Sequence, residues 1–171
     1  RNVSYAQNIT IPIDIISVAD LTTSMACSVA GGNCGNGPGQ CSACGGVWLL
    51  PLNYSKQAHY LLVNRILSMK GARVGIKGYH SSVPPSRSHN LSNNSFSLNT
   101  TITGWDTQAL SGSNRKLCLA IEEARDNFLA SPSNVSRVAI VMSAGAIDQS
   151  SGCEITSAPD WNNNGFPNDA G

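Results

Sequence analysis

The sequence is poor in charge and has no long apolar run. Only 12% of its 171 residues are charged, about half of the roughly 25% that is usual in globular domains. The 11 basic and 10 acidic side chains nearly cancel, and the basic ones form no stripe, which argues against nucleic acid as a partner. No stretch of about 20 apolar residues is present, so we expect no membrane-spanning helix.

Familiar catalytic patterns are also missing. The sequence has neither a Gly-x-Ser-x-Gly turn nor a phosphate-binding loop. Its three histidines, His59, His80 and His89, have no cysteine or aspartate companion at a usable spacing. We therefore expect a protein that is not an enzyme. The chain also begins without methionine or a leader, which predicts a processed chain or a piece of a longer one.

Asparagine, serine and threonine supply the polarity that charge does not. Seven Asn-x-Ser/Thr sequons are potential acceptors for N-linked glycans, which indicates an extracellular or cell-surface protein. The acceptors are Asn2, Asn8, Asn53, Asn90, Asn93, Asn99 and Asn134. All of them fall in segments that we expect to be loops or strand ends, and we expect most of them to be modified.

Six cysteines fit the same oxidising compartment. Four of them lie in a Gly-rich insert, residues 26–50, which is long enough that we expect it to be cross-linked. These four, Cys27, Cys34, Cys41 and Cys44, can pair in three ways, and a structural zinc site is the alternative interpretation. Cys118 and Cys153 are left as the third pair, by elimination and by their expected positions on a helix flank and in a loop at the ligand-binding end of the sheet.

A buried strand followed by three oxygen-bearing side chains is the central feature of the sequence. Residues 11–18 are mostly apolar without alternation, as in a strand covered on both faces. Asp20, Thr22 and Ser24 follow as D-x-T-x-S, where open α/β sheets place their ligands. Carboxylate and hydroxyl oxygens suit Mg²⁺ or Ca²⁺. The alternative is a polar turn that caps the next helix.

Two helices are predicted by apolar residues recurring every three or four positions. The first covers residues 55–69, with His59 facing solvent and Gly71 ending the helix. Its expected apolar stripe consists of Ala58, Leu61, Leu62, Ile66 and Met69. The second starts at Ser113, and its stripe consists of Leu117, Ala120, Ile121, Ala124 and Phe128.

Three further strands are expected. Residues 73–80 and 137–142 read as buried strands, and residues 81–94 as a loop between elements. The alternating segment 96–102 reads as an edge strand. Asp14 is expected to lie in solvent at the foot of the first strand.

Four of these stretches, residues 11–25, 73–82, 110–125 and 137–145, together resemble a von Willebrand factor A (VWA) domain in the right order. This resemblance implies an α/β fold: a Rossmann-like, doubly wound, mostly parallel sheet with one antiparallel edge strand. The family's last helices and strands have no counterpart here, so we expect the C-terminal part of the fold to be missing. The insert's C-x-x-C-G-G-x-W ending, residues 41–48, is similar to that of a group of archaeal surface proteins.

The resemblance also implies a metal-ion-dependent adhesion site. Its oxygen ligands would be Asp20, Thr22, Ser24 and Ser113, the last standing in place of the family's threonine. The family's second carboxylate is replaced by Ala144, so we expect a degenerate site that binds Mg²⁺ or Ca²⁺ weakly, because affinity depends on ligand charge.

Three regions are expected along the chain: an exposed lead-in over residues 1–10, the VWA-like domain over 11–148, and an Asn/Gly/Pro-rich loop over 149–171. Within the loop, Asp160, Asn162 and Asn164 open like a Ca²⁺-binding loop, but the acid expected at the twelfth position is absent. An ordinary turn is the simpler interpretation.

These features predict a non-enzymatic, N-glycosylated extracellular module, such as a subunit of a surface filament, pilus or adhesin. Its partners would be proteins, either copies of itself or other surface proteins. Strand 137–142 would lie at a sheet edge despite its apolar composition, and such an edge invites strand pairing. The alternative is a receptor that binds its ligand through a metal held by Asp20, Thr22, Ser24 and Ser113.

Overall fold

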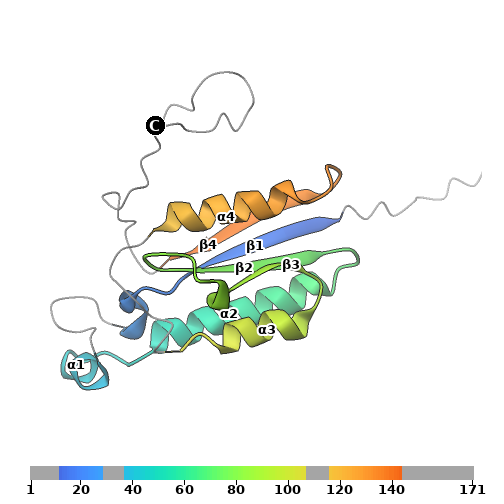
Figure 1. Ribbon diagram of the computed structural model, residues 1–171. Coiled ribbons are helices and arrows are strands. Elements are labelled where there is room, and N and C mark those ends of the chain that lie inside the picture. Colours follow the sequence, from blue (N-terminus) through green and yellow to red (C-terminus); the bar gives the residue numbers. More distant parts are fainter. Residues whose placement is uncertain (1–11, 29–36, 107–115, 144–171) are drawn as a thin grey trace, which may run out of the picture.

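The computed structural model describes residues 12–28, 37–106 and 116–143, and a four-stranded sheet forms its centre. The strand order is β3-β2-β1-β4 (Figure 1). Strands β1 (Ile13–Asp20), β2 (Arg73–Tyr79) and β4 (Ser136–Met142) are parallel, and β3 (Ser88–Ser92) is antiparallel to β2. The predicted mostly parallel sheet with one antiparallel edge strand is confirmed.

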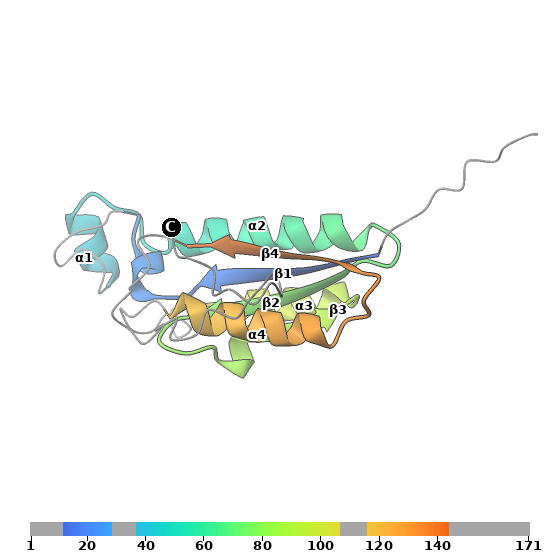
Figure 2. The ribbon, with the colours of Figure 1, turned by 90° about the horizontal axis from the view of Figure 1, so that it is seen from above.

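Both faces of the sheet are covered by helices (Figures 1 and 2). Helix α4 (Leu117–Leu129) packs on one face, and α2 (Leu50–Leu67) and α3 (Ser95–Thr103) pack on the other. Strand β1 lies between β2 and β4 and is buried along almost its whole length, which explains why its sequence shows no alternation. The core on the α4 face contains Ile16, Val18, Tyr79, Leu117, Ala120 and Ala124. The core on the opposite face contains Ala19, Leu52, Val63, Val74, Ile76, Leu98, Ile102 and Trp105.

Helix α2 buries a different stripe from the one predicted. Leu61, expected in the core, is 72% exposed, whereas His59, expected in solvent, is fully buried. The buried residues of the helix are Leu52, Ser55, His59 and Val63. These positions have helical spacing too, and the His59 ring can be buried because its Nδ1 lies 2.7 Å from the Ser55 carbonyl oxygen. The helix also begins earlier than predicted, at Leu50, with Pro51 in its first turn.

The predicted edge strand over residues 96–102 is wrong, because this segment is helix α3. Asn94 caps the helix: its Oδ1 accepts a hydrogen bond of 3.2 Å from the Ser97 backbone N–H. Leu98 and Ile102 are four residues apart and are both fully buried, while Phe96 is 80% exposed. The same residues satisfy a two-residue and a four-residue period, and the Asn94 cap favours the helix.

The antiparallel edge strand lies instead in the segment predicted to be a loop. Strand β3 follows a short 3₁₀ turn, η2 (Pro85–Arg87), and pairs with β2. Its sequence, SHNLS, has little strand propensity. The segment is nevertheless extended, because its main chain forms hydrogen bonds with the N–H and C=O groups on the neighbouring side of β2.

The Cys-rich insert is closed by a disulfide and by main-chain pairing. Cys27 is bonded to Cys41, and Cys27 also forms an antiparallel bridge with Trp48. A Cβ atom on Gly46 would lie 2.6 Å from Cys27 Sγ, so the C-x-x-C-G-G-x-W ending requires a glycine there. Cys44 and Cys118 are disulfide-bonded as well. These bonds exclude the zinc interpretation for Cys27 and Cys41, and Cys34 and Cys153 lie outside the described residues.

Candidate functional site at the carboxyl end of the sheet

Asp20, Thr22 and Ser24 come together at the carboxyl end of β1. Asp20 is fully buried, and its Oδ1 accepts hydrogen bonds from the Thr22 backbone N–H at 2.9 Å and from Thr22 Oγ1 at 2.7 Å. The Oγ atoms of Thr22 and Ser24 are 2.7 Å apart. Thr22 is the N-cap residue of the 3₁₀ turn η1 (Thr23–Ala26), and its side chain makes no capping hydrogen bond to that turn.

Ser143 adds a fourth side chain that sequence reasoning missed. It follows β4 directly, and its Oγ donates to Asp20 Oδ2 at 3.3 Å. Since β4 is parallel to β1, their carboxyl ends meet at one edge of the sheet. The available signal was its position as the first residue of Ser-Ala-Gly after the strand predicted over residues 137–142, a strand that the structure shows to be largely exposed rather than buried.

The four side chains offer the kind of ligand atom that a hard cation prefers, but they supply little negative charge. Every converging ligand atom is an oxygen, and Asp20 is the one carboxylate among the four side chains. No group of three or more His, Cys, Asp or Glu side chains suited to a metal occurs within the described ranges. Ser113 and Ala144 lie outside these ranges, as do Asp160, Asn162 and Asn164. Metal binding at this end of the sheet therefore stays a prediction.

The insert lies at the same end of the molecule. Helix α1 (Pro38–Ala43) and η1 extend beyond the carboxyl end of β1 (Figures 1 and 2). The disulfide from Cys27 to Cys41 ties α1 to the segment that follows Ser24. The cross-linked insert thus lies at the same end of the sheet as the oxygen cluster.

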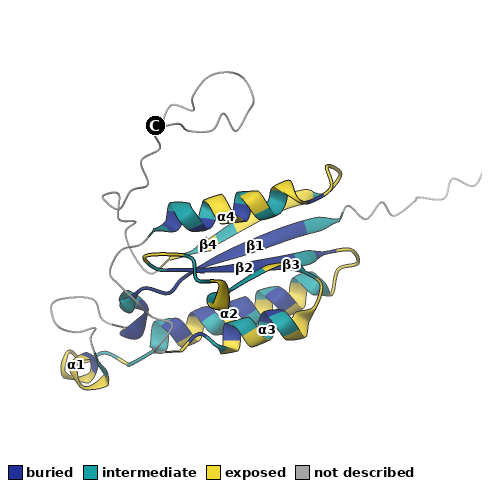
Figure 3. Cartoon of the chain, in the orientation of Figure 1, coloured by how far each residue is buried: buried dark blue, intermediate teal, exposed yellow. Residues whose placement is uncertain are grey.

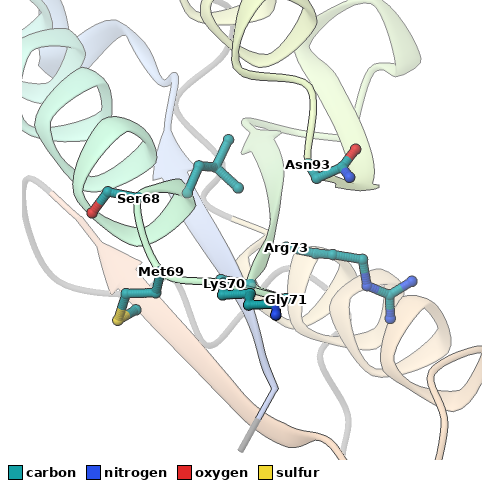
Figure 4. A pocket seen from close by; sticks show the side chains of 8 residues that line it. Ser68, Met69, Lys70, Gly71, Arg73 and Asn93 are labelled. Carbon is teal, nitrogen blue, oxygen red and sulfur yellow. The ribbon is translucent and has the colours of Figure 1, made fainter. Parts of the chain in front are cut away.

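A hollow of about 460 Å³ lies at the opposite end of the sheet (Figure 4). It is lined by residues 67–73 and Asn93. Its arginine, Arg73, is held by Asp14, with Nη2 2.6 Å from Asp14 Oδ2. Asp14 is 1% exposed, so its predicted place in solvent is wrong. Burial acts to raise the pKa of Asp14, but hydrogen bonds from Arg73 and Ser131 and the charges of Arg73 and Arg137 outweigh it and lower that pKa.

The three histidines form no catalytic pair within the part of the chain that the structure describes. Burial lowers the pKa of His59, and its Nδ1 is taken by the Ser55 carbonyl. The Ser55 hydroxyl lies farther away, at 3.4 Å. His80 is half-buried and bonds Ser81, and His89 lies 2.7 Å from the carbonyl oxygen of Asn90.

The glycan acceptors differ in their surroundings. Asn53, Asn90, Asn93 and Asn134 are exposed, and Asn99 is half-buried. Asn53 and Asn99 lie in α2 and α3, and Asn90 lies in the middle of β3, rather than in loops or at strand ends, which corrects the expectation for these three. Asn2 and Asn8 are outside the described residues.

Known structures share this fold. The chain is similar to the vWF domain of the type V pili tip protein Mfa5 from Porphyromonas gingivalis, with 20% identity and a TM-score of 0.59 over 81% of this chain and 40% of that one. It is also similar to a variant of the PilB minor pilin from Streptococcus sanguinis, with 15% identity and a TM-score of 0.58 over 81% and 31% of the two chains. A third similar structure is the adhesive tip pilin GBS104 from Group B Streptococcus agalactiae, with 15% identity and a TM-score of 0.56 over 80% of this chain and 46% of that one.

These similarities establish a VWA-like α/β fold. No family model and no curated protein matches the sequence. The chain spans about 40% of the Mfa5 vWF-domain chain. No helix in the described ranges has the length and apolar character needed to cross a bilayer.

Proposed function

We propose that this chain is a non-enzymatic, N-glycosylated interaction module of the cell surface, acting in a pilus, filament or adhesin. The similarity to pilus proteins supports this, since the compared structures include a tip protein, a minor pilin and an adhesive tip pilin. The disulfide between Cys27 and Cys41 supports an oxidising compartment. The exposed sequon asparagines are accessible for modification.

Strand β4 is the observation that carries the proposal. Within the described chain it pairs with β1 on one side and has no strand on the other. Val138 and Val141 are 39% and 43% exposed, and Figure 3 shows β4 as the least buried of the three parallel strands. The unpaired N–H and C=O groups of an apolar edge can accept a further strand. We propose that a copy of this protein, another surface protein or a further part of this protein supplies that strand.

A metal-dependent receptor is the second candidate. The convergence of Asp20, Thr22, Ser24 and Ser143 favours it. In this case Mg²⁺ bound by the cluster would present an open coordination position to an acidic ligand. The low charge of the cluster argues against tight binding in the resting state.

Sedimentation velocity of the oxidised, secreted chain distinguishes the two functions. For the structural module we expect the same concentration-dependent association in EDTA and in millimolar Mg²⁺. The receptor alternative predicts association only with Mg²⁺ and its loss in Asp20→Asn. A monomer at every concentration, with and without Mg²⁺, would contradict the proposal that this chain assembles.

A further inference from the structure

Asn90 differs from the other described acceptors because a buried lysine holds its amide. Lys77 is 3% exposed, and its Nζ donates to Asn90 Oδ1 at 3.0 Å. The same ammonium lies 3.2 Å from Glu123 Oε2 on α4. An ammonium can only donate, so the amide oxygen of Asn90 must face Lys77. Nδ2, the atom that receives an N-linked glycan, is therefore turned away from the lysine.

A hollow of about 390 Å³ opens beside this amide, within the range of roughly 300–1,000 Å³ of small-ligand sites. Val83 and Pro85 give it an apolar wall, and Lys77, His89 and Glu123 give it polar ones. Ser88 also lines it, and the Oγ atom of Ser88 is buried with no hydrogen-bond partner in the described residues. Such a mixture suits a sugar, whose ring face is apolar and whose edge carries donors and acceptors.

We propose that Asn90 carries an N-linked glycan whose first sugar sits in this hollow, with Lys77 as a positioning residue. This inference rests on the proposed glycosylated state of the protein. A glycosyltransferase would join sugar C1 to Asn90 Nδ2 as the C1–O bond to a lipid-linked pyrophosphate donor breaks. The pyrophosphate leaves with the bonding electrons, and Nδ2 gives up one proton.

The seated sugar has a consequence for assembly. Asn90 lies on β3, at the edge of the sheet opposite β4. A bulky polar group fixed at that edge blocks the approach of another strand. Association is then directed to β4.

The test is site-resolved enzymatic deglycosylation of the folded protein from an N-glycosylating secretory host. An amidase that cleaves the Asn–sugar bond is added, and mass spectrometry follows release at each asparagine. Asn134, exposed and away from the hollow, is the internal control. We expect release at Asn90 to be about tenfold slower than at Asn134, or about 1.4 kcal/mol. Denaturation should remove the difference.

Two variants assign the effect to the hollow. Lys77→Met removes the donor that orients the amide, and we expect release at Asn90 to accelerate while release at Asn134 stays unchanged. If that variant does not fold, Glu123→Ala removes one wall from a partly exposed helix position and should act in the same direction.

Equal release rates at the two sites in the folded wild type would overturn this inference, as would Lys77→Met or Glu123→Ala without effect. A glycan at Asn134 with none at Asn90 would also overturn it but leave the proposed function standing. A chain with no modified asparagine would overturn both this inference and the proposed glycosylated state.

Discussion

Asp20 is a buried carboxylate surrounded by hydroxyl groups. Thr22 satisfies one carboxylate oxygen, and Ser143 from β4 reaches the other. These hydrogen bonds satisfy both oxygens of the buried side chain without a cation. The cluster can therefore stabilise the turn after β1 by itself, and a divalent ion gains little from a single negative charge.

A second carboxylate should strengthen cation binding. Ala144 follows Ser143, whose Oγ lies 3.3 Å from Asp20 Oδ2. We expect Ala144→Asp to raise the Mg²⁺ affinity measured by calorimetry, because affinity follows the ligand charge. Ala144→Asn, of similar size and without charge, is the control. The same affinity in both variants would mean that the cluster is not a metal site.

Gly78 is a residue at which even a methyl group should be costly. A Cβ atom there would lie 2.6 Å from Leu21 Cδ1 and 2.7 Å from the Arg87 carbonyl oxygen. We expect Gly78→Ala to lower the free energy of unfolding by about 1–3 kcal/mol through overpacking, measured by urea denaturation. Gly39→Ala in α1 has open space around it and should cause no loss. Equal stabilities would contradict this close packing.

His59 should make stability depend on pH. Burial lowers its pKa from the ordinary value near 6.5, although the hydrogen bond to the Ser55 carbonyl opposes this. As the pH falls, the unfolded chain therefore binds a proton at His59 before the folded chain does. The free energy of unfolding is thus at its full value above about pH 6.5 and decreases as the pH drops toward the pKa of His59 in the folded chain. Burial lowers the pKa of His80 too, which gives the same sign.

The two histidines can be separated by substitution. Urea denaturation from pH 7.5 to 5 should show a smaller loss of stability in His59→Leu than in the wild type. His80→Asn is the control and should retain most of the loss. An unchanged slope in His59→Leu would show that the buried ring does not titrate.

At the scale of elements, the sequence correctly predicted the strands and helices whose pattern of apolar residues fits only one kind of secondary structure. Strands β1 and β2 are buried along most of their length, and helix α4 buries one stripe of apolar residues at helical spacing. Helix α3 was misread because Leu98 and Ile102 fit two periods. Strand β3 was missed because its pairing with β2 stabilises it, while its own residues are polar.

The candidate site was predictable to a similar degree. The spacing of Asp20, Thr22 and Ser24 after a buried strand was sufficient to place them together. The contact of Ser143 with Asp20 spans 123 positions of sequence, so the local pattern places Ser143 directly after a strand but does not predict the contact itself. The anchoring of Asn90 by Lys77 was likewise invisible, because it depends on β3 pairing with β2.

The insert should depend on its disulfide. Cys27 and Cys41 are 14 positions apart, and closing a loop of about 15 residues stabilises a fold by about 3 kcal/mol. We expect the double variant Cys27→Ser, Cys41→Ser to lose about 2–4 kcal/mol of unfolding free energy in guanidinium under non-reducing conditions. A loss below about 0.5 kcal/mol, the size of ordinary surface effects, would show that the insert folds without its cross-link.

At the scale of the whole molecule, the two sheet edges are unlike. Strand β3 is polar and carries a sequon, whereas β4 has the sequence SRVAIVM. If a further strand pairs with β4 and the glycan on Asn90 blocks β3, the module associates through only one edge of its sheet. Asymmetric association of this kind builds a head-to-tail assembly rather than a closed pair.

Sedimentation velocity of the oxidised wild-type chain beside Val141→Lys tests the central claim most directly. Charge on an edge strand opposes pairing, so we predict that the wild type associates as its concentration rises and that Val141→Lys stays monomeric. Phe96→Lys, at an exposed position on α3, should behave as the wild type. A dispersed wild-type monomer at all concentrations, with β4 amides exchanging freely with solvent, would contradict the account.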